Sequence, residues 1–548
     1  MVQKRRILVS SALPYANGDI HLGHLVEHLI TDFWVRFQKM RGQDCLAICA
    51  DDTHGAAIMI AARKQDISAE ELIARAQEQH IQDFKDFQIV YDHYSSTHST
   101  ANRELCNTIY AKLRDAKHIY AKAVEQYFCE NDKIFLPDRF VKGTCPNCKA
   151  ENQYGDSCDV CSATYMPVDL ANPSCSLCGS KPILKSTEQY FVRLEDFRVF
   201  LQKWVPEHTN EAIARKLQEW LDEQLRDWCI SRDAPYFGFE IPDCPGKFFY
   251  VWFDAPIGYI STTKEWCDLH KRDYREFWAD PSTEIFHNIG KDIIYFHTLF
   301  WPAMLHCAGL TTPKDVWVHG MLTANGEKLS KSRGTFINAR SYLNHLAPEY
   351  FRYYLACKLS NAITDIDLNF QDFIARVNAD LIGKITNVAS RSAQLLQKKM
   401  DGRLGKIPAG EGMSLINKAR EEQTILAEYF EARQFSKALL AIRGLADSVN
   451  KYFDDHKPWL LIGEDPETVR GILTCALNVF RIMCVYLKPI LPEYVRKVEA
   501  LFGEEAYTWE TANTVLEDRL LQPFVHLLSR IDEKAVDKIL LETQNLQS

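Results

Sequence analysis

The sequence contains no run of 18 consecutive apolar residues, so we expect no segment that spans a lipid bilayer. Near the N-terminus the apolar run at residues 7–9 ends at Ser10 and Ser11, which is far too short for the core of a secretory signal. A chain of this length without an export signal is expected where thiols stay reduced. These absences predict a cytoplasmic protein with no membrane partner and with free cysteines.

A surplus of positive charge is also absent. Lysine and arginine number 64 against 73 aspartate and glutamate residues, which gives a formal net charge of −9. A protein that coats nucleic acid without sequence preference needs a broadly basic surface, so that class of function is excluded and any RNA contact is predicted to be local. With 46% hydrophobic residues the chain can bury large cores, and 548 residues require about three or four domains.

Two common phosphate-binding motifs, the Walker lysine loop and the G-x-G-x-x-G fingerprint, are absent as well. Instead, the turn-rich loop at residues 14–24 (Pro-Tyr-Ala-Asn-Gly-Asp-Ile-His-Leu-Gly-His) lies between an apolar strand and the start of a predicted helix. The N-terminus of a helix offers unpaired N–H groups and a positive dipole to a phosphate. His21 and His24 add imidazole donors, and Gly23 lets a ligand approach the backbone, so the loop predicts a nucleotide site.

The first part of the chain alternates strands and helices. The strand at 7–9 and the helix at 24–40 are followed by an apolar strand at 45–50 and by a helix that the capping pair Ser68 and Glu71 opens. This order predicts a parallel α/β sheet with ligands at the strand ends. From about residue 120 to 185 the sequence changes to an insertion rich in Cys, Gly, Pro and Asn. Strands predicted at 249–252, 285–289 and 316–319 complete the sheet, and the chain from 376 onward predicts a helical bundle.

Six of the 17 cysteines form three Cys-x-x-Cys pairs, which is a metal-binding pattern. Two of the pairs are separated by nine residues and supply four thiolates to a tetrahedral Zn²⁺. Because every ligand position is then filled, such a zinc is structural and not catalytic. The alternative is a group of four buried free cysteines. The predicted ligands are Cys145, Cys148, Cys158 and Cys161.

Far downstream, residues 326–334 (Gly-Glu-Lys-Leu-Ser-Lys-Ser-Arg-Gly) form a glycine-bounded loop whose cations suit a polyphosphate leaving group. This loop and the one at 14–24 flank one split sheet, and together they resemble the HIGH and KMSKS signatures of the class I aminoacyl-tRNA synthetases. Leu329 stands where the second signature usually has Met, a volume-conserving change. The resemblance implies attack of an amino-acid carboxylate on the α-phosphorus of ATP, release of pyrophosphate, and transfer of the aminoacyl group to the 3′-terminal adenosine of a tRNA.

The resemblance also implies roles for individual residues. Mg²⁺ is expected as a charge neutraliser that accompanies ATP. The implied catalytic residues are His21, His24, Lys328 and Lys331. The implied ATP contacts are Tyr15, Asn17, His21, Gly23, His24, Gly290, Asp292 and Lys331.

Three further stretches are similar to the methionine-specific members of that family: residues 12–15 (Ala-Leu-Pro-Tyr), 251–259 (Val-Trp-Phe-Asp-Ala-Pro-Ile-Gly-Tyr) and 290–297 (Gly-Lys-Asp-Ile-Ile-Tyr-Phe-His). Aromatic walls suit a polarizable thioether. The insertion is too small for the editing domain of the relatives for isoleucine, leucine and valine. The likeness implies that Asp52 takes the substrate ammonium group. The implied methionine site is Ala12, Leu13, Tyr15, Asp52, Trp252, Pro256, Tyr259, Phe296 and His297.

The same likeness divides the chain and assigns a fold. We expect a split Rossmann-like parallel-sheet α/β catalytic domain with a zinc-knuckle insertion, followed by an all-α helical bundle. The expected segments are 1–117 (catalytic domain, first half), 118–228 (connective insertion), 229–324 (catalytic domain, second half), 325–375 (signature loop and linking segment) and 376–548 (anticodon-binding domain).

A second metal site is left open. Cys175 and Cys178 form half of a site, and Cys129 and Asp132 stand where relatives with two metals carry another Cys-x-x-Cys. Aspartate can bind zinc through oxygen. Three thiolates and one carboxylate therefore make an alternative site.

On the helical part, the resemblance implies that Asn387, Arg391, Pro458 and Trp459 contact the anticodon. Asn387 and Arg391 lie one helical turn apart, and Trp459 is placed to stack on an unpaired base. The alternative is a helix-cap proline at 458 and an ordinary core tryptophan at 459. The implied partners are methionine, ATP and the initiator and elongator tRNAs for methionine. We expect a monomer, or a dimer if the full protein has a further C-terminal domain.

Two alternatives of other kinds remain open at this point. A nucleotidyltransferase that activates a small metabolite has no need of the helical C-terminal third, and a non-catalytic zinc-ribbon RNA-binding module has no need of His21, His24 or Lys331. Amino-acid-dependent exchange of pyrophosphate into ATP distinguishes all three.

Overall fold

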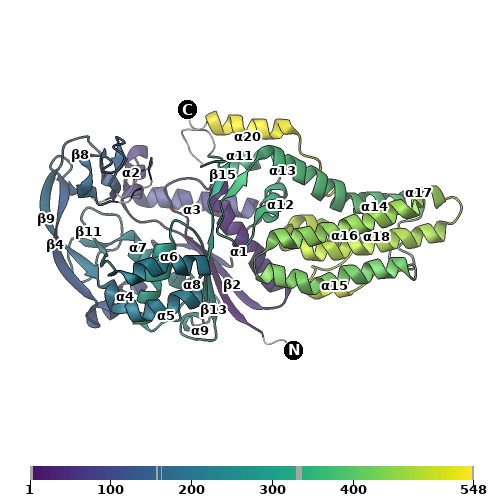
Figure 1. Ribbon diagram of the computed structural model, residues 1–548, viewed down its shortest axis with the longest axis horizontal. Helices are drawn as coiled ribbons and strands as arrows, with labels where there is room; N and C mark the ends of the chain where they lie inside the picture. The colour runs from purple at the N-terminus through teal and green to yellow at the C-terminus, as the bar shows by residue number, and fades with distance from the viewer. Residues whose placement is uncertain are drawn as a thin grey trace.

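The computed structural model describes residues 4–136, 138–155, 158, 160–161, 163, 165–328 and 336–545, with the backbone alone for residues 138, 327 and 328. Figure 1 shows an elongated molecule with a parallel sheet near its middle, a β-rich insertion at one end and a bundle of long helices at the other. Residues 329–334 of the second signature loop, including Lys331, lie outside the described residues, and so does the side chain of Lys328.

Five parallel strands form the central sheet, in the order β14-β13-β1-β2-β3. Ile7 on β1 pairs with Cys45 on one side and with Glu284 on the other, so segments far apart in the chain are neighbours. The strands β1, β2 and β13 are buried on both faces, as parallel sheets require, and this explains their continuous apolar runs. The strands are β1 (Arg6–Ser11), β2 (Asp44–Asp51), β3 (His93–Ser96), β13 (Glu284–Gly290) and β14 (Asp315–His319).

Four of the five predicted strands, at 7–9, 45–50, 285–289 and 316–319, are confirmed in this sheet, but the strand predicted at 249–252 is wrong. β12 (Lys247–Phe249) pairs antiparallel with β11 (Ser231–Asp233) in a separate ribbon, and α7 (Val251–Asp254) begins directly afterwards. A short apolar run has the same pattern in a buried strand and in a buried helical turn, so periodicity alone could not separate the two.

Helices cover both faces of the sheet. One face packs against α1 and the linking helix α12, and the other packs against α4, α8 and α10. The helix predicted from Ser68 is confirmed, because the Ser68 hydroxyl accepts a hydrogen bond from the Glu71 N–H at 3.0 Å. The helices are α1 (Leu22–Met40), α2 (Ala56–Gln65), α3 (Ala69–Asp86), α4 (Thr100–Asp115), α8 (Ile257–Leu269), α10 (Trp301–Ala308) and α12 (Pro348–Lys358).

The insertion consists of two small antiparallel sheets, ordered β10-β9-β4-β5 and β7-β6-β8, and two helices that return the chain to the central sheet. The long β4–β9 ribbon carries the cysteine-rich part away from the sheet (Figure 1). The elements are β4 (Ile119–Cys129), β5 (Ile134–Phe135), η1 (Asp138–Phe140), β6 (Val141–Thr144), β7 (Gln153–Tyr154), β8 (Ala171–Cys175), β9 (Ile183–Val192), α5 (Arg198–His208), α6 (Glu211–Asp222) and β10 (Trp228–Cys229).

The helical part is built around α18 (Pro466–Leu487), which contacts α14, α15 and α16. α18 is long and apolar enough to cross a membrane, which corrects the expectation that no segment is, yet 89% of its apolar window is buried inside the bundle. Among the described residues it is the one helix with the length and apolar composition of a membrane span. The other helices are α13 (Phe370–Arg376), a π-helical continuation (Val377–Thr386), α14 (Asn387–Lys399), α15 (Glu411–Glu431), α16 (Phe435–His456), α17 (Pro458–Leu461) and α19 (Pro492–Phe502).

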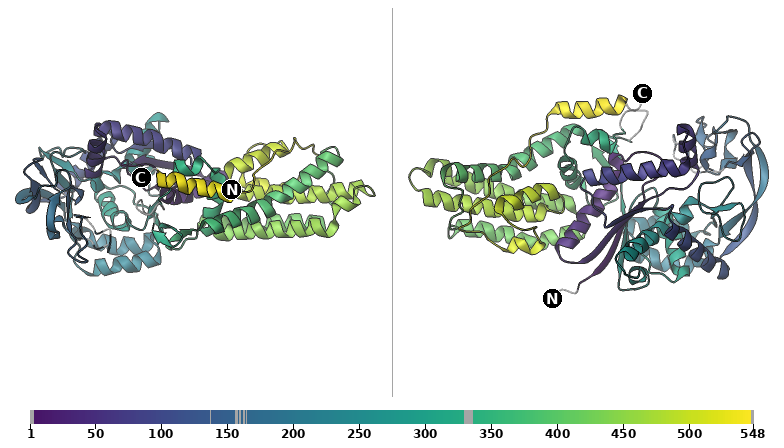
Figure 2. Two further views of the ribbon diagram at one scale, coloured as in Figure 1. Left: turned by 90° about the horizontal axis from the view of Figure 1, so that it is seen from above. Right: turned by 180° about the vertical axis from the view of Figure 1, so that it is seen from behind.

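The chain does not end in the bundle. α20 (Glu533–Asn545) lies over the junction of the sheet and the bundle, as both views in Figure 2 show. It packs on α11 (Ala339–Leu343), where the Glu542 carboxylate is 2.7 Å from Nε2 of His345. The part of the chain that links the central sheet to the bundle also contains a small sheet. Its strands are β15 (Leu322–Ala324), β16 (Glu327–Lys328) and β17 (Ile366–Leu368).

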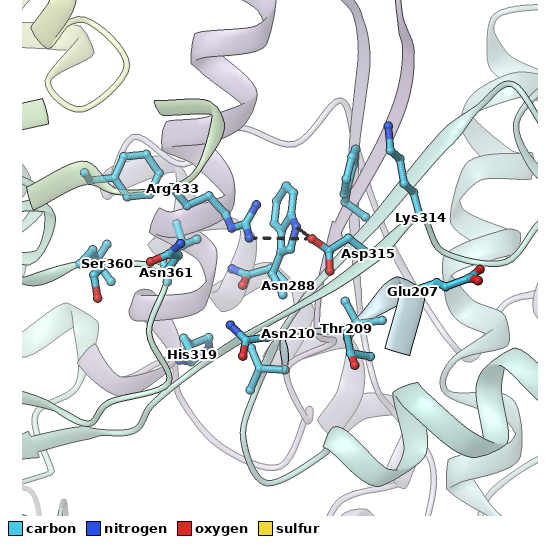
Figure 3. A pocket seen from close by; sticks show the side chains of 17 residues that line it. Glu207, Thr209, Asn210, Asn288, Lys314, Asp315, His319, Ser360, Asn361 and Arg433 are labelled. Carbon is cyan, nitrogen blue, oxygen red and sulfur yellow. Dashed lines mark hydrogen bonds and ion pairs between the residues drawn. The ribbon is translucent and has the colours of Figure 1, made fainter. Parts of the chain in front are cut away.

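The turn between α15 and α16 docks the bundle on the edge strand β14. The guanidinium of Arg433 lies 4.0 Å over the Trp317 ring and 3.9 Å from the Asp315 carboxylate, beside a cavity of about 290 Å³ (Figure 3). Burial lowers the pKa of Arg433 to about 10, so it remains charged at neutral pH. None of the residues predicted for catalysis or binding lines this cavity, which is a gap between three packed parts of the chain.

A fully buried arginine joins the bundle, the linking helix and the sheet. Arg352 on α12 donates hydrogen bonds to the Asp32 carboxylate on α1 at 2.6 Å, to the carbonyl of Phe87 at 3.0 Å and to the carbonyl of Ile490 at 2.7 Å. Its side chain is 0% exposed. Burial lowers its pKa to about 10, and the contact with Asp32 opposes that effect.

Replacing Arg352 by methionine is expected to destabilise the protein strongly. The substitution keeps the volume but removes the donor to the carbonyls of Phe87 and Ile490 and one of the donors to Asp32, which still accepts from Arg36 and from the Val90 N–H. Breaking a buried pair from one side costs about 3–5 kcal/mol, and a loss near the lower end is expected because Arg36 remains. The urea midpoint of unfolding, followed by circular dichroism, measures the loss. Arg496→Met is the control, because its ion pair with Glu493 is solvent-exposed and such pairs contribute about 0–1 kcal/mol. Equal midpoints for the two variants would contradict the role of Arg352.

Candidate active site and metal centres

A cleft of about 610 Å³ lies at the carboxyl ends of β1, β2, β13 and β14. The structure brings most of the predicted nucleotide and methionine residues together in it: Ala12, Leu13, Tyr15, His21, Gly23, His24, Asp52, Trp252, Gly290 and Asp292. Asn17 does not: it is exposed and does not line the cleft. Lys331 and the Lys328 side chain lie outside the described part of the chain, so their positions relative to the cleft remain a prediction.

The two histidines of the first signature cap helix α1 reciprocally. The His24 N–H donates to Nδ1 of His21 at 3.2 Å, and the His21 N–H donates to Nδ1 of His24 at 3.4 Å. The rings stack with their centres 3.6 Å apart. Burial holds the pKa of His24 well below its usual value, and the charge of a protonated His21 beside it would lower that pKa further. The His24 imidazole is therefore neutral. Since both Nδ1 atoms accept, a neutral ring at either position carries its proton on Nε2 and is an N–H donor there.

The next part of the cleft is built around a buried carboxylate. Burial, with the nearby Asp254 charge, raises the pKa of Asp52 well above its usual value. Oδ1 of Asp52 has no hydrogen-bond partner among the described residues. Asp254 is held by His54, whose Nδ1 is 2.5 Å from its carboxylate. A buried acceptor that lacks a donor is costly, and an ammonium group is one kind of ligand donor that satisfies it.

An aromatic pocket adjoins Asp52. The rings of Trp252 and Phe296 stack with centres 4.0 Å apart. Nε2 of His297 is 2.9 Å from the Tyr259 hydroxyl, and its Nδ1 is 3.1 Å from the carbonyl oxygen of Ile293. Burial lowers the pKa of His297 to about 4, so the ring is neutral, donates from Nδ1 and accepts the Tyr259 proton at Nε2. The lining residues are Ala12, Leu13, Asp52, Trp252, Ala255, Pro256, Tyr259, Ile293, Phe296 and His297.

This pocket contains every predicted methionine residue except Tyr15, which lies in the main cleft, where its hydroxyl donates to the His54 carbonyl at 2.6 Å. Its walls are mainly apolar and aromatic, and the Tyr259 hydroxyl already donates its proton to His297. Such a pocket accepts a linear, polarizable apolar chain better than a charged or strongly polar one.

Sequence analysis missed several residues of the cleft. Burial raises the pKa of Glu27 to about 7, opposed by His319 at 3.4 Å. Glu27 and His28 follow His24 by one helical turn, so the 3.6-residue period of α1 was a signal that could have placed them on the same face. Arg139 reaches the cleft from the insertion, and no local pattern predicts that.

Both cysteine clusters have the geometry of a metal site. In each, the four ligand atoms lie within 4.8 Å of one another. The Cys145 and Cys161 sulfurs are 3.9 Å apart and the Cys148 and Cys158 sulfurs 3.5 Å apart. Tetrahedral zinc with Zn–S bonds of about 2.3 Å places its sulfurs about 3.8 Å apart, so the separations fit. Either cluster can therefore hold a metal ion. The second consists of Cys129, Asp132, Cys175 and Cys178.

The residues predicted for the anticodon meet at the far end of the bundle. The Arg391 guanidinium lies 4.3 Å over the Phe453 ring and 5.5 Å from the Trp459 ring, and it pairs with Asp454 at 2.8 Å. Trp459 is 43% exposed and its ring stacks on Phe453. The alternative of a buried core tryptophan is therefore wrong, and an aromatic face is open to solvent. Asn387 is half-buried one turn before Arg391, while Pro458 is buried.

Comparison with known proteins agrees with this architecture. Residues 7–393 match the family model "tRNA synthetases class I (M)", and residues 404–525 match "Anticodon binding domain of methionyl tRNA ligase". A curated relative from Bdellovibrio bacteriovorus, named as a methionine–tRNA ligase, is 52% identical over 547 residues, which is 100% of this chain and 80% of that protein.

Solved structures of methionyl-tRNA synthetase from Mycobacterium tuberculosis share the fold. A complex with methionyl-adenylate has a TM-score of 0.80 at 24% identity and covers 95% of this chain and 99% of its own. The free form has a TM-score of 0.73 at 23% identity, and the match covers 97% of this chain and 99% of that chain. From the family match over most of its length and the 52% identity to a full-length relative, the chain belongs to the methionyl-tRNA synthetases of class I.

Proposed function

We propose that this protein is a methionine–tRNA ligase, which activates methionine with ATP and transfers the methionyl group to tRNA. The observation that carries the proposal is that the cleft lined by His21 and His24 and the aromatic pocket lined by His297 adjoin and share Asp52 and Trp252 as walls. This arrangement places a polyphosphate, an ammonium group and an apolar side chain in a fixed order. The match to an anticodon-binding domain favours this function over a nucleotidyltransferase without RNA.

In the first step, a methionine carboxylate oxygen attacks the α-phosphorus of ATP. A new O–P bond forms, the bond between the α-phosphorus and the bridging oxygen breaks, and pyrophosphate leaves with that electron pair. His21 and His24 donate from Nε2 to the phosphate oxygens, and their capping bonds fix the rings before the substrate arrives. Fixed donors of this kind stabilise the transition state without reorganisation.

Asp52 binds the methionine ammonium group, and the aromatic pocket binds the thioether. Gly290 and Asp292, at the end of β13, line the same cleft and contact the nucleotide. Lys328 and Lys331 close over the phosphates from the second signature loop, and Mg²⁺ accompanies ATP. In the second step, a hydroxyl of the terminal adenosine of tRNA attacks the methionyl carbonyl carbon, and AMP leaves.

The first cysteine cluster holds a structural Zn²⁺ in this proposal. Four thiolates at tetrahedral distances leave no open position for a water molecule, so the ion stabilises the insertion and does not act on the substrate. The anticodon of the tRNA contacts Asn387, Arg391, Pro458 and Trp459, with Trp459 as the stacking platform.

Methionine alone among the twenty amino acids is expected to support rapid exchange of pyrophosphate into ATP. The Trp252 and Phe296 walls favour a thioether, while a side chain shorter by one methylene is discriminated by about 1–3 kcal/mol, so slow exchange with close analogues is expected. Radiolabelled pyrophosphate exchange measures both rates. Faster exchange with isoleucine or cysteine than with methionine would overturn the assignment.

Cys145→Ala is expected to lower the zinc content by one ion per chain and to disorder the insertion, because structural zinc contributes directly to folding. Elemental analysis gives the zinc content, and hydrogen exchange over residues 119–192 reports the disorder. Cys307→Ala, a free cysteine outside the clusters, should change neither. Unchanged zinc in Cys145→Ala would refute the site.

Trp459→Ala is expected to lower kcat/KM for tRNA charging about tenfold or more and to leave pyrophosphate exchange within about twofold of the parent. The loss of one base stack costs about 1–3 kcal/mol, and exchange needs no tRNA. Parallel assays of charging and exchange on one preparation test this. A parallel fall in both rates would mean that Trp459 supports the fold, and no change in either would place the anticodon contact elsewhere.

A further inference from the structure

The loop at residues 14–24 is attached to the rest of the catalytic domain at both ends and in its middle. Backbone hydrogen bonds of 2.8 to 3.0 Å to Asp52 and Ile337 hold its two ends. In the middle, the turn at Gly18 is exposed, and its carbonyl oxygen lies 2.9 Å from Nε2 of His80 on α3. This side chain therefore fixes the middle of the loop, just before the two histidines that cap α1.

The ring of His80 lies between two hydrogen-bond acceptors. Its Nδ1 is 2.7 Å from the Asp51 carboxylate at the end of β2, and its Nε2 faces the Gly18 carbonyl. The same Asp51 oxygen accepts the Tyr94 hydroxyl proton at 2.5 Å, as an ionised carboxylate does. Neither a carbonyl nor a carboxylate donates, so both bonds form only when both ring nitrogens carry a proton. His80 therefore fits this site as an imidazolium.

The charge of the ring decides whether the loop stays attached. The side chains of His80 and Asp51 are 1% and 0% exposed, so the carboxylate is the partner that makes a buried cation tolerable. A neutral ring has one proton and donates to only one of its two acceptors. The charge-assisted bond to Asp51 is the stronger, so the bond to the Gly18 carbonyl is the one that a neutral ring gives up.

Titratable and charged groups face His80 from each element that packs against it. They are Asp51 on β2, Tyr94 on β3, Asp83 on α3, Arg340 on α11, which pairs with Asp83, and His24 and His28 on α1. Burial lowers the pKa of His80, but the hydrogen bond and the charge of Asp51 outweigh burial and raise this pKa above its ordinary value of 6.5. The cation, and with it the loop contact, is therefore present below the raised pKa and is lost as the pH rises through it.

We propose that His80 is a positioning residue for adenylate formation, because its imidazolium, bonded to Asp51 and to the Gly18 carbonyl, holds His21 and His24 where they receive the phosphates of ATP. The inference rests on the proposed function for the identity of the reaction. His80 does not line the cleft, so it acts through the loop and does not contact the substrate. The protonation of one buried side chain thus controls the geometry of the nucleotide site.

His80→Gln is expected to lower kcat for pyrophosphate exchange about tenfold or more and to leave KM for methionine within about twofold. Glutamine can donate to one acceptor but carries no charge, and a hydrogen bond from a charged group contributes more than a neutral one. His118→Gln is the matched control, because it removes a partly exposed pair with Asp196, 2.7 Å long, outside the cleft. Equal kcat values for the two variants would contradict the role of His80.

The pH profile of kcat separates positioning from a purely structural role. In the parent protein kcat is expected to fall as the pH rises through the raised pKa of His80. Asp51→Asn keeps an acceptor for Nδ1 but removes the charge that stabilises the cation, so this fall should move to lower pH by about one unit or more. The substrates titrate in the same way in every variant, so the difference between the profiles reports the protein.

Two outcomes of these profiles would overturn the proposal. One is the same alkaline fall in His80→Gln as in the parent protein, because the group that titrates would then be another. The other is an unchanged position of the fall in Asp51→Asn, because the carboxylate would then have no effect on the titrating group.

Hydrogen exchange over residues 14–24, compared at one pH, tests the attachment without any reaction. Faster exchange is expected in His80→Gln than in the parent protein or in His118→Gln, because the turn at Gly18 has lost its contact. Equal exchange in all three proteins would overturn the attachment. A parent protein without methionine-dependent pyrophosphate exchange would instead contradict the proposed function, and the hydrogen-exchange result would still decide whether His80 holds the loop.

Discussion

The buried pair of Arg352 and Asp32 is the interaction on which the rest of the arrangement depends. Asp32 lies in the middle of α1, and the same arginine donates to the carbonyl of Ile490 at the end of α18. The first turns of α1 carry His24 and Glu27, which line the cleft. One helix thus both lines the cleft and supports the bundle. Both side chains are at most 1% exposed, so their hydrogen bonds lie in a medium of low dielectric and tie α1, which lines the cleft, to the bundle.

Much of the fold could be predicted because its signals are local. Four of the predicted strands are largely buried, and a strand that is buried on both faces needs apolar residues at successive positions. These strands correspond to the apolar runs at 7–9, 45–50, 285–289 and 316–319. The cleft residues could be placed for a different reason. Parallel strands bring their carboxyl ends to one edge, so short motifs that follow separate strands meet there without any knowledge of the long connections.

The remainder depended on contacts that no local pattern records. Arg139 reaches the cleft only because the insertion folds back on α2, and Arg433 docks on Trp317 only because the bundle returns to the edge of the sheet. The apolar run at 249–252 divides between the end of β12, which pairs with β11, and the start of α7, so tertiary contacts and not its own pattern determine its structure. α18 interrupts its apolar sequence with Asn478 and Arg481, whose partners in the following segment make them compatible with the core.

Histidine at the start of α1 suits two tasks, the helix capping that the structure shows and the phosphate contact that we propose. Serine, threonine and aspartate are the usual residues before a helix, because one side-chain oxygen accepts the exposed N–H groups. His21 and His24 perform that capping with Nδ1. A serine or aspartate that caps the helix has no fixed N–H donor left for a ligand, whereas a neutral imidazole has a second nitrogen on the opposite side of the ring. Capping therefore fixes the tautomer, and the fixed tautomer leaves Nε2 as the N–H donor that the proposed phosphate contact needs. Protonation would remove the Nδ1 acceptor and break the cap, so burial, which keeps His24 neutral, protects the fold of the loop and its chemistry together.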